Sequence, residues 1–195
     1  MRLPEAINTF TEWARKGRVL FTLEDLRKLF PRDRDSAFRG GLDRLVSAGV
    51  LQRVSRGLFV FALAGRRDPH LLERIAVALR RGCYSYLSLE SALSEHGVIS
   101  QVPLAGLTVM TTGRAGLFDT PFGRIEFTHT KRSVNDILKQ TRETGRPLRI
   151  ATPGAAARDL RRVGRNVHLI DEHELEEAIA DGRQGEPERP GSTRL

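Results

Sequence analysis

Residues 34–61 join a helical pattern directly to a hairpin pattern, and this combination restricts the possible folds more than any other part of the sequence. Apolar residues recur at the three- and four-residue spacing of one helix face from Phe38 to Val46. Two short apolar segments, 51–54 and 58–61, then flank a Ser-Arg-Gly turn, which is typical of a β-hairpin. The stretch therefore predicts a helix that runs directly into a hairpin.

Three shorter elements precede this stretch. We expect a helix, a short strand and a second helix at 4–17, 19–21 and 22–30. Thr22 is placed to cap the second helix with Asp25 as its return partner, and Asp33 or Asp35 is placed to cap the third. Helix, strand, helix, helix, hairpin is the order of a winged helix-turn-helix. The alternative is a generic small α+β domain whose basic residues are scattered by chance.

The rest of the chain predicts a second domain that mixes helices and strands. Helices are expected after Asp68, at 88–96 with Ser88 as its cap, at 133–144, after Thr152-Pro153 as a cap, and after Asp171 as a cap. Strands are expected at 107–111, 124–130, 148–151 and 168–170, with a turn-rich segment at 112–123. The predicted fold class is α+β, with a winged helix-turn-helix at 1–65, a mixed α/β domain at 66–181 and a disordered tail at 182–195.

Positive charge is concentrated at the N-terminal end. The 195 residues carry a formal net charge of +8, and residues 1–65 hold 12 Arg/Lys against 7 Asp/Glu, whereas the longer remainder holds 20 against 17. This distribution favours a nucleic acid or another anionic partner. Arginine supplies most of the charge and suits bidentate contact with phosphate or base edges, although an arginine-rich genome produces the same excess.

The sequence carries no membrane or secretion signal. No apolar run is long enough to span a bilayer, and the N-terminus MRLPEAINTF lacks the charged-then-apolar layout of a signal peptide. We therefore expect a cytoplasmic protein with no membrane partner. Cys83 is the one cysteine, so it cannot form an intrachain disulfide, and we expect it to pack as a small apolar side chain.

The predicted third helix has the composition of a DNA-reading helix. In a winged helix this element enters the major groove with its N-terminal half against the bases, and small residues there permit close approach. Arginines at the helix start and on the hairpin would contact phosphate or the minor groove. The predicted DNA-binding residues, with Arg44 and Arg56 foremost, are Arg32, Arg34, Ser36, Ala37, Arg39, Gly40, Arg44, Arg53 and Arg56.

Catalytic and metal-binding patterns are incomplete. Asp119, Glu126 and Lys131 resemble the acid–acid–lysine set of metal-dependent nucleases, but that set needs a lysine two positions after the second acid, where this chain has Thr128. His129, in FTHT, is expected to be a hydrogen-bonded structural residue, and the run DEHELEEA a solvated helix face. We predict a protein that is not an enzyme and has no catalytic residues, metal or cofactor.

Three segments carry a family resemblance. They are the pattern L-x-x-L-V-x-x-G-V-L-x-R-V-x-x-G-L-F at 42–59, YLSLESALSEHGVISQVP at 86–103, and LTVMTTGRAGLFDTPFGRIEFTHT at 107–130. Together they resemble AbiEi-type antitoxins of type IV toxin–antitoxin systems, over roughly residues 1–180 of a chain that is short for the family. Motif residues that would form either the antitoxin surface or its fold, with the fold favoured, are Ser88, Glu90, His96, Thr112, Gly113 and His129.

The resemblance implies two functions. The protein would repress its own operon by binding inverted repeats in the promoter, as two copies on DNA, and it would counteract a nucleotidyltransferase-like (AbiEii-type) toxin. Two alternatives remain open at this stage. One is an enzyme, either a metal-dependent nuclease or a modifier of the toxin, and the other is a protein-interaction module whose N-terminal helices bind a partner other than DNA.

Overall fold

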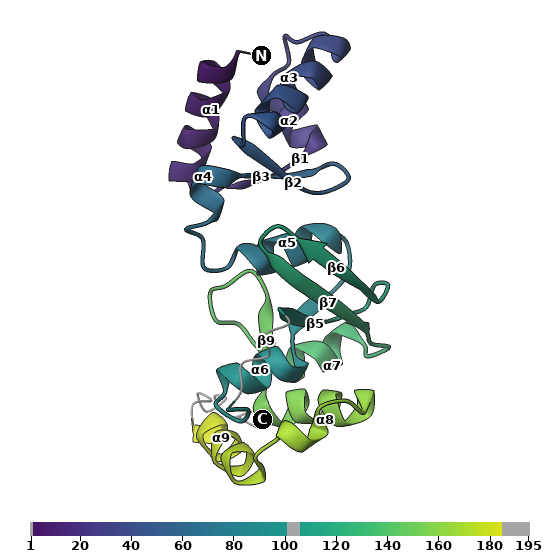
Figure 1. The fold of residues 1–195 in the computed structure, drawn as a ribbon. Coiled ribbons are helices and arrows are strands. Elements are labelled where there is room, and N and C mark those ends of the chain that lie inside the picture. The colour runs from purple at the N-terminus through teal and green to yellow at the C-terminus, as the bar shows by residue number, and fades with distance from the viewer. Residues whose placement is uncertain (1, 101–105, 185–195) are drawn as a thin grey trace, which may run out of the picture. The chain divides into compact units, whose positions relative to one another are not determined.

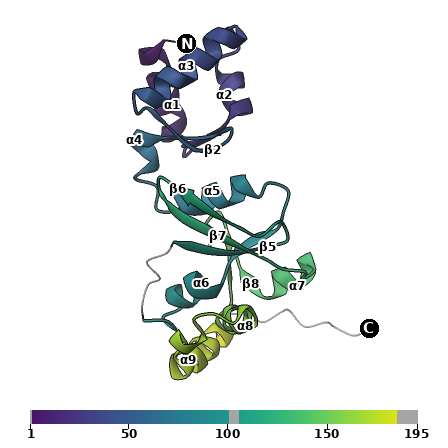
Figure 2. The same ribbon diagram turned by 45° about the vertical axis from the view of Figure 1, so that its right-hand side comes forward.

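The computed structural model describes residues 2–100 and 106–184 (Figures 1 and 2). These residues form both helices and strands, as the α+β prediction requires. The chain divides into two compact units: unit 1 comprises Met1–Arg81 and Leu117–Ile125, and unit 2 comprises Gly82–Gly116 and Glu126–Leu195. The finer division at residue 65 stays a prediction. No helix in the described ranges is long and apolar enough to cross a membrane.

Unit 1 begins with the succession that the sequence predicts. Its elements are α1 (Leu3–Arg15), β1 (Leu20–Thr22), α2 (Leu23–Leu29), α3 (Asp35–Ser47), β2 (Leu51–Ser55), β3 (Leu58–Phe61), α4 (Ala62–Gly65) and α5 (Leu71–Leu79). The three strands form an antiparallel sheet in the order β1-β3-β2. The predicted order of helix, strand, helix, helix and hairpin is therefore confirmed.

The start of α2 confirms the predicted capping box. The backbone N–H of Asp25 donates to Thr22 Oγ1 at 3.1 Å, and the backbone N–H of Thr22 donates to Asp25 Oδ2 at 2.9 Å. Burial raises the pKa of Asp25, but the hydrogen bonds from Thr22 and Arg18 outweigh it, so the pKa lies below its usual value. The cap thus satisfies two backbone donors of the helix and holds a carboxylate in its ionised form.

An aromatic cluster centred on Phe10 holds unit 1 together. The ring of Phe10 is fully buried and lies 5.3 Å from the ring of Phe21, 5.9 Å from that of Phe30 and 5.6 Å from that of Phe61, measured between centroids. These rings come from α1, β1, the end of α2 and β3, so one side chain connects four segments. Such tilted and edge-on pairs contribute about 0.5–1.5 kcal/mol each beyond the area that they bury.

A second, larger sheet follows in the chain. Its elements and the helices around it are β4 (Ser85–Leu87), α6 (Leu89–Glu95), β5 (Leu107–Thr111), β6 (Gly116–Thr120), β7 (Gly123–His129), α7 (Val134–Lys139), β8 (Thr141–Arg142), β9 (Arg149–Ala151), α8 (Pro153–Val163), the 3-10 turn η1 (Val167–Leu169) and α9 (Glu172–Gln184). The strand order is β6-β7-β5-β4-β9-β8. β4 pairs antiparallel with β5 and parallel with β9.

The apolar core of unit 2 lies between β4, α6, β9 and α8. Leu87, Leu93 and Leu160 are fully buried there. α8 is amphipathic because its alanines and Leu160 face this core, whereas its arginines Arg158 and Arg161 are exposed. α8 and α9 lie side by side in both views (Figures 1 and 2), and Leu175 of α9 is buried in the same core.

Three predicted helix caps are wrong, and in two of them a distant partner takes the capping side chain. The third, Thr152, occupies the N-cap of α8 without a side-chain hydrogen bond. α3 has Arg34 at its N-cap with no side-chain hydrogen bond, because the carboxylate of Asp35 pairs with Arg27. Asp33 does not cap α3 either. The hydroxyl of Ser88 does not cap α6, because it donates to a carboxylate of α8. The prediction that Asp171 caps α9 is confirmed by two backbone N–H groups that donate to its Oδ1.

Five other expectations differ from the structure. The helix expected at 133–144 is α7, which ends at Lys139, and Thr141–Arg142 form the strand β8. The turn-rich segment 112–123 contains a strand, β6, because pairing with β7 supplies its backbone hydrogen bonds. The expected strand at 168–170 is η1, closed by a bond from Ile170 N–H to the Val167 carbonyl. Cys83 is exposed rather than packed. α9 runs to Gln184, so the first residues of the predicted tail are helical, and 185–195 lie outside the described residues.

Removal of the α2 cap should destabilise unit 1. Thr22→Ala is expected to lower the free energy of unfolding by about 1 kcal/mol, because it removes the acceptor of a helix N–H. The matched control is Thr152→Ala, since Thr152 occupies the N-cap of α8 without a side-chain capping bond. This substitution should lower the free energy of unfolding by only a few tenths of a kcal/mol, roughly. Urea titrations followed by far-UV circular dichroism and by the fluorescence of Trp13, the one tryptophan, measure both. Equal losses in the two variants would contradict the assignment.

Candidate nucleic-acid interface

One face of α3 is held in the core of unit 1. Phe38 and Leu42 are each 5% exposed and Leu45 is 2% exposed, and Gly41 is buried between them. These positions follow the helical spacing that the sequence predicts for this face. The burial of this face fixes the rotation of α3 and therefore determines which side chains face solvent.

The opposite face of α3 holds the residues predicted to read DNA. They are small or cationic, and all are exposed except Gly40, which is half-buried: Ser36, Ala37, Arg39, Gly40 and Arg44. A Cβ added at Gly40 would lie 3.6 Å from Arg44 Nη1. The guanidinium of Arg44 therefore lies beside the bare backbone of Gly40. The face also carries one exposed acid, Asp43.

Most arginines of this region are available for an external partner. Arg32 and Arg34, which precede α3, and Arg56, in the turn between β2 and β3, are exposed. Within the described residues, the guanidinium groups of these three arginines and of Arg39 and Arg44 have no ion pair or hydrogen bond to the protein. They form an exposed, uncompensated set of cations on consecutive segments of unit 1.

The hairpin presents two of the predicted residues, Arg53 and Arg56. Arg53 on β2 is exposed, and its guanidinium lies 5.3 Å from the ring centroid of Phe59, its cross-strand partner on β3. Arg56 stands in the turn next to Gly57, whose φ of +76° is a left-handed conformation that favours glycine. Because β2 packs against α3, the hairpin and the helix belong to one packed body.

Arg27 is a residue of this region that the sequence pattern did not indicate. Its Nη1 donates to the carbonyl of Asp33 at 3.0 Å, its Nη2 pairs with Asp35, and its guanidinium lies 4.8 Å from the ring centroid of Phe38. It therefore holds the connection between α2 and α3 at the start of the candidate interface. Its partners are six to eleven residues away and follow no helical or strand period, so no local signal marks it.

A buried polar network surrounds Ser88 in unit 2. The carboxylate of Asp159, fully buried, accepts from Ser88 Oγ at 2.9 Å and from Tyr86 OH at 3.2 Å, and it pairs with Arg132 Nη1 at 2.5 Å. Burial, followed by the charge of Asp159, raises the pKa of Tyr86 to about 12. Leu89 follows Ser88 with a φ of 56°, a strained value for a leucine. Ser88 has no exposed surface, so its hydroxyl serves as a structural donor.

Glu90 is the second buried charge of unit 2. It is 2% exposed and accepts from Arg165 Nε at 3.0 Å and from Asn166 Nδ2 at 2.9 Å. Arg165 also pairs with Glu126 on β7. One guanidinium therefore links α6, β7 and the segment after α8.

The remaining motif residues are also bound within unit 2. His96 Nε2 donates to a β9 carbonyl at 2.8 Å, and His129 Nδ1 donates to the carbonyl of Gly113 at 2.8 Å. Thr112 Oγ1 accepts from the backbone N–H of Tyr84 at 3.0 Å. The expected hydrogen bond of His129 is confirmed. Because a carbonyl only accepts, each histidine carries a proton on the nitrogen named here.

The nuclease-like residues Asp119, Glu126 and Lys131 do not converge on a common site. Asp119 pairs with Arg124 at 2.6 Å, Glu126 pairs with Arg165, and Lys131 is exposed, so each acid of the nuclease-like set is held by an arginine.

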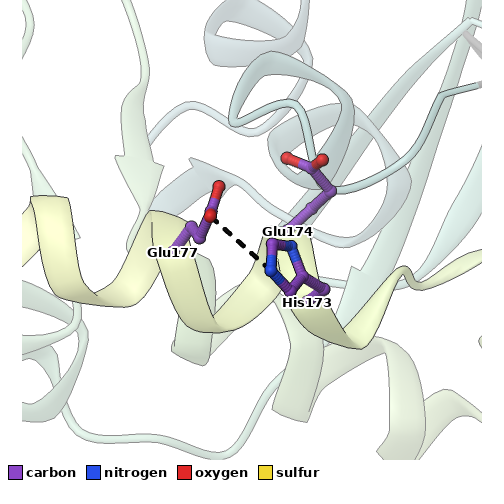
Figure 3. A group of neighbouring side chains, drawn as sticks. All are labelled: His173, Glu174 and Glu177. Atoms are coloured by element: carbon purple, nitrogen blue, oxygen red, sulfur yellow. Dashed lines mark ion pairs between the residues drawn. The ribbon is translucent and has the colours of Figure 1, made fainter.

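On α9, the ligand atoms of His173, Glu174 and Glu177 lie within 4.8 Å of one another (Figure 3). All three are exposed, as the prediction of a solvated face requires, and His173 pairs with Glu177 at 3.7 Å. No buried polar atom or further ligand accompanies them in the described part of the chain, so this group is a surface feature.

Comparison with known proteins identifies a fold relative. No protein-family model and no curated protein matches the chain. The chain is similar to the solved structure of the Rv2827c protein from Mycobacterium tuberculosis, with a TM-score of 0.56 and 17% sequence identity over 96% of this chain and 73% of that one. At this identity the likeness concerns the fold alone.

The buried pair Asp159–Arg132 should contribute far more to the free energy of unfolding than the exposed pair Asp119–Arg124. Asp159→Asn is expected to cost about 3–5 kcal/mol, because it leaves the partly buried Arg132 without a counter-charge. Asp119→Asn changes the same functional group in an exposed pair, and it should cost less than about 1 kcal/mol. Chemical denaturation followed by circular dichroism compares them, and a loss for Asp159→Asn no larger than that for Asp119→Asn would refute the structural role.

Proposed function

We propose that this protein is a sequence-specific DNA-binding autorepressor and an antitoxin similar to the AbiEi type. The observation that supports DNA binding is the outer face of α3, where small residues and arginines without a protein partner lie on a helix whose other face is buried. The order of α1, β1, α2, α3, β2 and β3 matches a winged helix-turn-helix, in which α3 is the recognition helix and the β2–β3 hairpin is the wing.

In this proposal α3 enters the major groove with its N-terminal half. Ser36, Ala37 and Gly40 let the helix backbone approach the base edges closely, and Arg39 and Arg44 reach bases or phosphates. Arginine contacts guanine O6 and N7 in a bidentate manner, and such a pair contributes about 1–3 kcal/mol of discrimination. Gly40 narrows the helix on the side that would face the DNA, and the guanidinium of Arg44 lies beside it.

Phosphate contacts would fix the position of the helix. Arg32 and Arg34 lie at the start of α3, where free backbone N–H groups also attract phosphate. Arg53 and Arg56 on the hairpin would contact the adjacent backbone or minor groove. Binding should therefore weaken steeply with salt, because each phosphate contact releases counterions.

The antitoxin part of the proposal rests on the family resemblance. Unit 2 would counteract a nucleotidyltransferase-like toxin, and two copies of the chain would bind the inverted repeats of its promoter. Its motif residues form internal hydrogen bonds and ion pairs, which supports a scaffold role for them. Co-expression with a nucleotidyltransferase-like gene next to its own, scored by growth, tests this part independently of DNA binding.

Loss of one helix arginine and one hairpin arginine should strongly weaken promoter binding. Arg44→Ala with Arg56→Ala is expected to weaken binding by at least about 30-fold, equivalent to 2 kcal/mol for two lost contacts. The control, Arg66→Ala with Arg124→Ala, removes the same charge from exposed positions of unit 1 that lie outside α3 and the hairpin. A gel-shift assay on the promoter measures both, with circular dichroism to verify folding. Equal affinities for the two double variants would refute the interface.

Gly40→Ala should separate stability from binding. Alanine at this helix-interior position is expected to stabilise unit 1 by about 0.5–1 kcal/mol, because the added Cβ meets nothing closer than 3.6 Å and the backbone loses less entropy on folding. The same methyl group would block close approach to DNA and weaken promoter binding by about fivefold or more. Denaturant titration and gel shift measure the two effects. Higher stability with unchanged affinity would place Gly40 outside the interface.

A further inference from the structure

Unit 1 contains an open cleft of about 690 Å³ that lies apart from α3 and the hairpin turn. It is formed by the end of α1, the segment before β1, the end of β3, α4 and the segment leading into α5. The volume falls within the range of small-molecule sites, which is roughly 300–1,000 Å³. Its apolar lining comes from Ala14, Val19, Phe61, Leu63 and Ala64. Leu63 is 65% exposed, the largest exposure among the large apolar side chains described.

The charged lining of the cleft is unbalanced. Asp68 is already engaged, since its Oδ2 accepts from Arg74 Nε at 2.8 Å and its Oδ1 accepts from the backbone N–H of His70 at 2.9 Å. Arg15 and Arg67 also line the cleft and are exposed, and within the described residues their guanidinium groups have no ion pair or hydrogen bond. The cleft therefore combines an apolar surface with two uncompensated positive charges.

We propose that this cleft binds a small amphiphilic carboxylate, with the apolar body against Leu63 and its neighbours and the carboxylate paired with Arg15 and Arg67. A guanidinium binds a carboxylate through two parallel hydrogen bonds, which suits an anionic head group. Contact with Leu63 removes exposed apolar surface from water. A nucleic-acid backbone has no apolar body to cover this surface, so the chemistry of the cleft favours an amphiphile over DNA. The inference does not depend on the proposed DNA binding.

The test uses 8-anilinonaphthalene-1-sulfonate, an apolar anion whose fluorescence rises on binding. The full-length wild-type protein is expected to bind the probe, with energy transfer from Trp13, which neighbours the cleft residue Ala14. Decanoate below its micellar concentration should displace the probe. Acetate, which has the carboxylate without the chain, and decyl maltoside, which has the same chain but an uncharged head group, should not.

Two variants locate the site. Arg67→Glu should weaken binding of the probe and of decanoate by about tenfold, because an attractive charge becomes repulsive. Arg66→Glu is the matched control, since it makes the same change at the neighbouring exposed residue, which does not line the cleft. Leu63→Asp, at an exposed position that folding does not require to be apolar, should weaken binding at least as much as Arg67→Glu.

Three results would overturn the proposal. Equal binding by the Arg67→Glu and Arg66→Glu variants would place the probe elsewhere. Displacement by decyl maltoside as effective as that by decanoate would show that the anionic head group is not recognised. Displacement by a poly-glutamate peptide but not by decanoate would assign the cleft to an acidic protein segment. Promoter binding is measured separately, so failure of either proposal leaves the other standing.

Discussion

The rotation of α3 about its own axis is the constraint on which the candidate interface depends. Phe38, Leu42 and Leu45 are removed from water, and a fully buried side chain of this size stabilises the fold by about 1.5–3 kcal/mol. A rotation by one residue, about 100°, would expose this set. The small and cationic residues of the opposite face are therefore held toward solvent by the packing beneath them. Arg27 strengthens the constraint, because it ties the preceding connection to the start of α3.

Unit 2 depends on a different interaction, the neutralisation of buried charge. Asp159 and Glu90 lie almost entirely out of water, and each is held by a guanidinium and by further hydrogen bonds. Such pairs are costly to bury and more costly to break, so they fix which segments lie against one another. This explains why the motif around Ser88 is polar although it lies inside the fold. The strained backbone of Leu89 directly follows Ser88, which is a member of this network.

Local patterns in the sequence predicted much of unit 1. The Thr22–Asp25 cap, the β2–β3 hairpin and the buried face of α3 depend on residues within a few positions of one another, and such signals can be recognised in a single chain. Three of the failures have a common cause in distant partners. Asp35 and Ser88 have the chemistry of helix caps, but Arg27 and Asp159 bind their side chains instead. β6 was missed for the same reason, because a strand rich in turn residues exists only through its pairing partner.

The sequence by itself determined the order of elements in unit 1, the side of α3 that is buried, and the concentration of arginine on the other side. Periodicity and turn chemistry act over three to five residues, which is why they can be read directly. Only the tertiary structure decided which of those arginines lack a partner, which acids are buried, and that Arg15 and Arg67 line an apolar cleft. These properties depend on contacts between residues far apart in the chain, and such contacts form only when the apolar faces pack together.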